Sequence, residues 1–283
     1  MILYKYKSFT NTKSFEYTVD SLVNKYLYFS RPSELNDPFD CQIQVDANAK
    51  GRAFNSWRNE MIKESDVDKQ FLTIDYTNQL FSDTKILNGM KTLTHLMVES
   101  NHLLSLTTDC LNESMWALYA GNYNGICIGY NTNGEIPSFL PHKIEFIVEG
   151  YETIIPSKIQ TVKFKQIEYD NTGKHVMKLF SSRASQVKEV TYNLRHKKDC
   201  WATEKEYRAI IHDADYDIFN QIKKTVKVFY DDNLLEEIIF GYQVPVATIN
   251  MIIQMIKTNY SNPVKFYKIK ADLEKYCLIK EEI

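Results

Sequence analysis

The chain has 283 residues, of which 44% are hydrophobic and 25% charged, enough for one large domain or two small ones. Tyrosine (19) and phenylalanine (15) are abundant while glycine (9) and proline (7) are scarce, which argues against disordered, collagen-like or linker-rich architecture. A net charge of -2 and a pI near 6.3 provide no overall attraction to nucleic acid or to an anionic membrane.

The first hundred residues contain alternating strand and helix signals. Residues 2–6 and 27–30 predict strands, and apolar residues at helical spacing predict a helix over 14–25. Pro32 and Pro38 predict an ordered turn over 31–40, because proline cannot lie inside a helix or a central strand. Residues 42–100 are mainly helical in character, with Ile86, Met90, Leu93 and Met97 on one face of a predicted helix.

The rest of the chain predicts mostly strands. A helical turn is expected at 115–121, a long amphipathic helix over 174–197 and a further helix over 246–256. Strands are expected at 125–130, 144–148, 161–169, 199–213, 226–230, 237–240 and 264–268. With neither an internal repeat nor a linker, the pattern favours a single α+β domain over 1–283, with a mixed, mainly antiparallel sheet and a helical insertion near 42–100.

Charge is unevenly distributed around the predicted helix. Residues 157–198 contain ten Lys or Arg and three acids, whereas residues 199–237 contain ten acids and five bases. A basic helix next to an acidic strand is suited to an anionic, phosphate-bearing ligand. The same pattern also fits a solvated amphipathic helix with no ligand.

The cysteine pattern and the hydropathy of the chain indicate its cellular compartment. Five cysteines are scattered without a C-x-x-C pair, which argues against a zinc site or a disulfide framework and favours a reducing compartment. The N-terminus lacks the apolar core of a signal peptide, and no apolar run reaches the ~18 residues that a membrane span needs. We therefore expect a cytoplasmic protein with no metal and no membrane partner.

A series of unusual segments carries a family resemblance. They are K-Y at 5–6, Y-F-S at 28–30, N-D-P-F-D at 36–40, M-W-A-L-Y-A-G at 115–121, W-A-T-E-K-E-Y-R at 201–208 and I-I-F-G at 238–241. In this order they resemble the bacterial domain-of-unknown-function family DUF2971 over essentially the whole chain. The family name implies little about mechanism.

A weaker resemblance bears on function. The order of a first strand with a basic or aromatic residue, a strand ending in Ser and a late E-x-E strand resembles ADP-ribosyltransferases, which cleave nicotinamide from NAD. This resemblance implies NAD as the substrate and an ADP-ribosyltransferase-like sheet. It places Lys5 and Tyr6 at the first NAD contact, Tyr28 and Ser30 in the second-strand motif, and 204–206 in the catalytic motif. The chain differs in having neither Arg nor His at residues 4–6.

The E-x-E segment suits this chemistry. On a strand, Glu204, Glu206 and Arg208 share one face. Glu206 is the candidate that stabilises the positive charge developing on the ribose, and Glu204 the candidate that accepts a proton from water or an acceptor. Arg208 on the same face would favour the charged carboxylates, and Trp201 would wall the cleft. The alternative is a surface ion pair without catalytic meaning.

Residues 36–40 also admit two interpretations. Asn36 and Asp40 could contact a ribose at the edge of a nucleotide pocket. Alternatively, this is a turn whose Asn and Asp side chains satisfy the backbone while Phe39 fills the core. Met115, Trp116 and Tyr119 are interpreted as core residues because they recur at helical spacing.

Two functional hypotheses follow. The first is an enzyme that cleaves NAD and transfers ADP-ribose to water or to a protein or nucleic-acid acceptor, an activity compatible with a toxin or a phage-defence effector. The second is a non-catalytic module that binds a nucleotide or a protein through the basic helix 174–198, including Lys197 and Lys198. A nuclease is less favoured because the basic stretch has no acidic cluster with metal-binding spacing.

Overall fold

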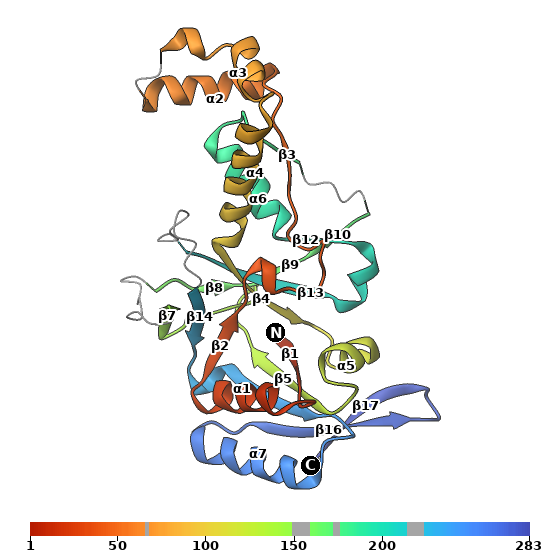
Figure 1. Cartoon of the computed structure of the whole chain (residues 1–283). Coiled ribbons are helices and arrows are strands. Elements are labelled where there is room, and N and C mark those ends of the chain that lie inside the picture. Colours follow the sequence, from red (N-terminus) through yellow and green to blue (C-terminus); the bar gives the residue numbers. More distant parts are fainter. Residues whose placement is uncertain (66–67, 149–158, 172–175, 214–223) are drawn as a thin grey trace.

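The protein is mixed α/β, with a mainly antiparallel open sheet (Figure 1). The computed structural model describes residues 1–65, 68–148, 159–171, 176–213 and 224–283. Eight strands form the largest sheet, in the order β17 (Cys277–Glu282), β16 (Lys265–Asp272), β15 (Leu235–Phe240), β5 (Gly125–Asn131), β1 (Ile2–Ser8), β4 (Asn101–Thr107), β13 (Glu206–His212) and β9 (Lys165–Gln166). Neighbouring strands are antiparallel except for β15 and β16.

A smaller antiparallel sheet packs against the first. Its order is β2 (Tyr26–Phe29), β14 (Lys224–Phe229) and β7 (Lys143–Val148). Alternate residues of both sheets, such as Leu3, Phe29, Val226 and Ile238, are fully buried in one hydrophobic cluster. Two helices, α1 (Thr12–Val23) and α7 (Val246–Asn259), complete this core through their apolar faces.

The helices of residues 51–99 lie at the opposite end of the molecule from α7 (Figure 1). They are α2 (Gly51–Glu64), the short helix η2 (Lys69–Phe71), α3 (Ile74–Leu80) and α4 (Thr84–Glu99). The chain enters them through β3 (Gln44–Asp46), which pairs in parallel with β11 (Val176–Lys178). A mainly helical segment at 42–100 is therefore present, although Leu93 of the predicted apolar face is 38% exposed.

Short elements connect these parts. They are η1 (Pro32–Glu34), α5 (Glu113–Tyr119), β6 (Ser138–Phe139), β8 (Val162–Lys163), β10 (Glu168–Tyr169), α6 (Arg183–Asn193), β12 (His196–Lys197), η3 (Asp199–Glu204) and η4 (Asp232–Leu234). The strand predicted over 161–169 is divided into β8, β9 and β10, and β17 was not predicted. Among the helices that the structure describes, none is long and apolar enough to cross a membrane.

The long helix predicted over 174–197 is wrong as a continuous element. Its described part consists of β11, the shorter helix α6 and β12, while residues 172–175 lie outside the described ranges. The Ser182 side chain accepts a hydrogen bond from the backbone N–H of Ser185, which caps α6 and fixes its start at Arg183. Val187 of α6 is 52% exposed, whereas the amphipathic pattern of the predicted helix would place this apolar side chain on the inward face.

The predicted strand 199–213 is correct only in its second half. Residues 199–204 form η3, and β13 begins at Glu206. Lys205 between them has a φ of 47°, a left-handed conformation that ends η3 before the strand begins. Glu204 therefore does not lie on the strand, and simple alternation does not explain its proximity to Glu206.

Candidate functional site

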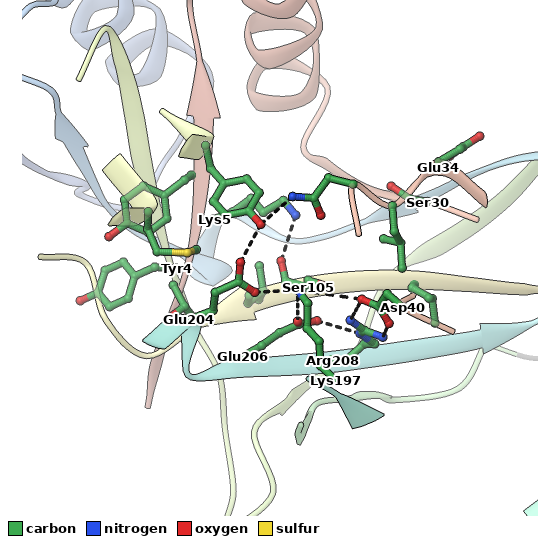
Figure 2. A pocket seen from close by; sticks show the side chains of 18 residues that line it. Tyr4, Lys5, Ser30, Glu34, Asp40, Ser105, Lys197, Glu204, Glu206 and Arg208 are labelled. Atoms are coloured by element: carbon green, nitrogen blue, oxygen red, sulfur yellow. Dashed lines mark hydrogen bonds and ion pairs between the residues drawn. The ribbon is translucent and has the colours of Figure 1, made fainter. Parts of the chain in front are cut away.

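A cavity of about 230 Å³ opens where two central strands separate. β1 and β4 pair at Tyr4 and Thr107, and β4 then bridges to the end of β2 through Leu103 and Ser30. The cavity between β1 and β4 is lined by side chains from β1, β4, β12 and β13, and from η1, α5 and η3 (Figure 2).

This cavity gathers most of the residues selected from the sequence. Those that line it are Lys5, Tyr6, Ser30, Asn36, Asp40, Glu204, Glu206 and Arg208. Tyr28 does not line it, because its ring belongs to a separate cavity and its hydroxyl donates to Glu34 at 2.8 Å. Trp201 does not line it either, and its ring lies 4.8 Å from the ammonium of Lys197.

Arg208 organises the floor of the cavity. Its guanidinium donates to both carboxylate oxygens of Asp40, at 3.0 and 2.8 Å, and its Nε donates to Glu206 Oε1 at 2.7 Å. It also donates to the carbonyl oxygen of Leu194 at 3.0 Å. Figure 2 shows Asp40 and Glu206 on two sides of the guanidinium. Arg208 is 1% exposed, so these partners take the place of its hydration shell.

Lys197 is the second cation of the floor, and sequence reasoning did not place it there. Its ammonium donates to Glu204 Oε2 at 2.7 Å and to Glu206 Oε2 at 3.4 Å. Because β12 carries it into the cavity, Lys197 is only 8% exposed and is unavailable as part of a basic contact surface. Its Nζ joins the two glutamates that Lys205 separates in the chain.

The ion pairs keep the floor charged. Burial raises the pKa of Glu206, but the adjacent Arg208 and Lys197 outweigh it and lower that pKa to about 2. Burial lowers the pKa of Lys197, but Glu206 and Glu204 reverse this and leave it above its usual value. Together with Asp40, the floor therefore has three carboxylates and two permanent cations.

Helix α5 adds a tyrosine to this network. Tyr119 donates its hydroxyl hydrogen to Glu204 Oε1 at 2.6 Å and accepts a hydrogen bond from Asn36 Nδ2 at 2.9 Å. Burial and the Glu204 carboxylate raise the pKa of Tyr119. The interpretation of Met115, Trp116 and Tyr119 as core is correct for Trp116, which is fully buried, whereas the other two line the cavity.

The β1 strand supplies a lysine at the rim. Lys5 Nζ donates to the carbonyl oxygen of Ser105 at 2.9 Å, across the gap between β1 and β4. Burial and the nearby Lys7 lower the pKa of Lys5 to about 7, although Glu206 and Glu204 raise it. Tyr6 also borders the cavity, but its hydroxyl is turned to the Asp109 carbonyl oxygen, to which it donates at 2.8 Å.

The turn at 36–40 confirms part of the turn interpretation, while contact with a ribose stays a prediction. Asp37 caps the turn by accepting from the backbone N–H of Phe39 at 3.0 Å, as expected for an Asx turn. Phe39 does not fill the core: it is 63% exposed, and the Lys198 ammonium lies 3.3 Å from its ring centre. Asp40, in contrast, is 3% exposed and is held by Arg208.

The described fold and site define a mixed α/β protein whose mainly antiparallel sheet separates around a charge-paired carboxylate cavity. Residues 115–209 match the family described as "Protein of unknown function (DUF2971)", and this match confirms the DUF2971 resemblance over these residues. The segments at 5–6, 28–30, 36–40 and 238–241 lie outside the match. The matched segment contains Tyr119, Lys197, Glu204, Glu206 and Arg208 of the cavity. The searches of curated proteins and of solved structures found no match. Within the described ranges, no group of His, Cys, Asp and Glu has the arrangement of a metal site.

Proposed function

We propose that the protein cleaves the nicotinamide glycosidic bond of NAD and transfers the ADP-ribose to water or to a macromolecular acceptor. The observation that supports this most is the meeting of Glu204 and Glu206 with Lys5 and Ser30 around one cavity. The two glutamates supply the negative charge that an oxocarbenium-like ribose requires. The likeness to ADP-ribosyltransferases is part of this proposal.

The chemistry assigns different roles to the two glutamates. The bond between ribose C1′ and the pyridinium nitrogen breaks, and neutral nicotinamide leaves with the electron pair. The Glu206 carboxylate, held ionised by Arg208 and Lys197, stabilises the positive charge left on the ribose. An oxygen nucleophile then adds to C1′, and its proton passes to Glu204, whose other contacts are Tyr119 and Lys197.

The cavity dimensions suit one end of this substrate. A volume of about 230 Å³ lies below the range of about 300–1,000 Å³ that is typical of sites enclosing a whole drug-sized ligand. In the proposed complex the cavity holds only the nicotinamide riboside end of NAD. The phosphates and the adenosine extend beyond the cavity. Asn36 and Ser30 line the cavity with polar groups that suit ribose hydroxyls.

The test is release of free nicotinamide from NAD, followed by chromatography with and without cell lysate. We expect the parent protein to release nicotinamide and Glu206→Gln to reduce the rate at least about 100-fold, because an amide cannot supply the charge. The variant should stay folded, since the remaining Asp40 and Glu204 balance Lys197 and Arg208.

Glu135→Gln is the matched control, because Glu135 is exposed and does not line the cavity. It should retain the parent rate. Release that survives in Glu206→Gln removes Glu206 from the mechanism. Absence of release by the folded parent, with and without lysate, contradicts the proposed activity.

A further inference from the structure

A second cavity of about 400 Å³ lies on the other side of Lys5. It is enclosed by α1, β1, β2 and β14, and Leu104 and Tyr130 form buried parts of its wall. Lys5 lines both cavities, whereas none of the carboxylates of the first cavity lines the second. The second cavity is therefore a separate site with different chemistry.

Its charge is predominantly positive. Among the residues that the structure describes, three lysines, Lys5, Lys7 and Lys227, line it together with one carboxylate, Asp20. Asp20 is already engaged: it accepts the Tyr26 hydroxyl hydrogen at 2.5 Å and lies 3.8 Å from Lys227 Nζ. The cavity thus has more ammonium groups than its own carboxylate can neutralise.

Lys7 is the most informative of these groups. Its side chain is partly buried, and burial lowers its pKa. Within the described residues Lys7 has no hydrogen-bond or ion-pair partner for its ammonium, and Lys5 nearby has only the Ser105 carbonyl oxygen. A partly buried ammonium without a counterion is unfavourable, so a bound anion would stabilise it.

Aromatic side chains line the same cavity. Tyr17 and Tyr28 border it and remain 59% and 37% exposed, so their rings are available to a ligand. Tyr26 lies deeper, with Lys227 Nζ 4.1 Å from its ring centre. Ser21 and Thr225 add hydroxyl groups to the lining. Exposed tyrosine rings beside ammonium groups combine stacking with charge, as recognition of a nucleobase and its phosphates requires.

We propose that this second cavity binds a nucleoside phosphate, with the phosphates against Lys5, Lys7 and Lys227 and the base on the exposed tyrosine rings. This inference does not depend on NAD cleavage. It requires only that a phosphorylated nucleoside enters this cavity.

The test is calorimetric titration of the whole chain with ADP, and with adenosine and inorganic pyrophosphate separately. We expect ADP to bind more tightly than either fragment. Lys7→Gln should weaken ADP binding about tenfold to hundredfold, because it removes one charge-assisted contact. Lys257→Gln, an exposed lysine of α7 outside the cavity, should leave the affinity unchanged.

A thermal unfolding curve for Lys7→Gln shows whether a loss of ADP binding reflects a loss of folding. Tyr17→Ala is a second variant for the same titration, at an exposed residue of the cavity. Equal ADP affinity in Lys7→Gln and the parent overturns the proposal. Pyrophosphate binding as tightly as ADP overturns the role of the tyrosines. ADP binding that is lost in Lys7→Gln but kept in Glu206→Gln supports the second site even if no NAD is cleaved.

Discussion

At the scale of single residues, the unusual feature is a cluster of ions buried in the sheet. Asp40, Glu206 and Arg208 are each no more than 3% exposed. Removing such groups from water costs several kcal/mol per ion, and replacing them by apolar side chains is often neutral or stabilising in other proteins. Stability alone therefore does not account for the cluster, and the proposed function, which needs ionised carboxylates in the cavity, offers a reason for it.

The pKa of Glu206 leads to a prediction about acid stability. Because its pKa is lowered from 4.5 to about 2 in the folded protein, it stabilises the fold fully above the unfolded value. This stabilisation, on the order of 3 kcal/mol, is lost as the pH falls from about 4.5 to about 2. Urea unfolding of the parent and Glu206→Gln measures it: the free-energy difference between the two should shrink across this window. A pH-independent difference would contradict the assigned ion pairs.

Residue-level sequence reasoning identified only part of this site. Glu206 and Arg208 could be selected because alternation on a strand determines which residues share a face. Lys197 was assigned to a basic helix, since a Lys-Lys pair directly after Arg195 and His196 gives no sign that one ammonium is buried. Tyr119 was assigned to the core with Trp116, although only packing determines which residue of a short helix faces inward.

At the scale of elements, the I-I-F-G segment has a structural explanation. Gly241 directly follows β15 and packs against the loop that follows α5. A Cβ atom at Gly241 would lie 2.0 Å from the Tyr123 carbonyl oxygen. Because that neighbour is backbone, it cannot rotate away. The glycine thus permits the close approach of the chain after β15 to the loop before β5, as the hydrogen bond from the Gln243 N–H to the Tyr123 carbonyl oxygen at 3.2 Å shows.

Gly241→Ala should therefore destabilise the protein, by an amount on the order of 1–3 kcal/mol that is typical of overpacking. Gly89→Ala is the matched comparison, because Gly89 lies within α4 and no atom stands within 4 Å of a Cβ built there. That change should stabilise the helix by roughly 0.5–1 kcal/mol. Chemical denaturation measures the free energy of unfolding of both variants. Equal changes of the same sign in the two variants would contradict the packing argument.

The predictions of helices and strands were wrong where local capping and turn signals conflicted with the apolar periodicity of the sequence. Apolar spacing over 174–197 suggested one helix, but Ser182 caps a new helix that begins only at Arg183. The strand predicted from 199 overlooked η3, because the positive φ of Lys205 has no signature in a lysine. Strands such as β1, β2 and β5 were predictable because short β-branched and aromatic runs are bounded by polar breaks.

At the scale of the whole molecule, the hydrophobic residues form separate clusters. The largest lies between the two sheets and includes Phe29 and Phe240. Another lies among the helices of the 42–100 segment and joins Ala49 and Phe54 to Leu179 and Phe180, which follow β11. The helical segment is therefore stabilised in part by a separate core, and Asp40 of the site lies just before it in the chain.

This arrangement predicts that the insertion opens locally without loss of the sheet. The Phe180 ring packs against Trp57 and Phe81, with ring centres 5.1 and 4.8 Å away. Phe180→Ala should cost about 3–5 kcal/mol within this cluster and speed amide hydrogen exchange in α2 and α3, while β1, β4 and β13 stay protected. Phe29→Ala, in the core between the sheets, should instead speed exchange throughout. Hydrogen-exchange mass spectrometry distinguishes these patterns. If Phe180→Ala exposed β13 as much as α2, the insertion and the sheet would be one cooperative unit, and the Asp40–Arg208 ion pair would couple the two cores.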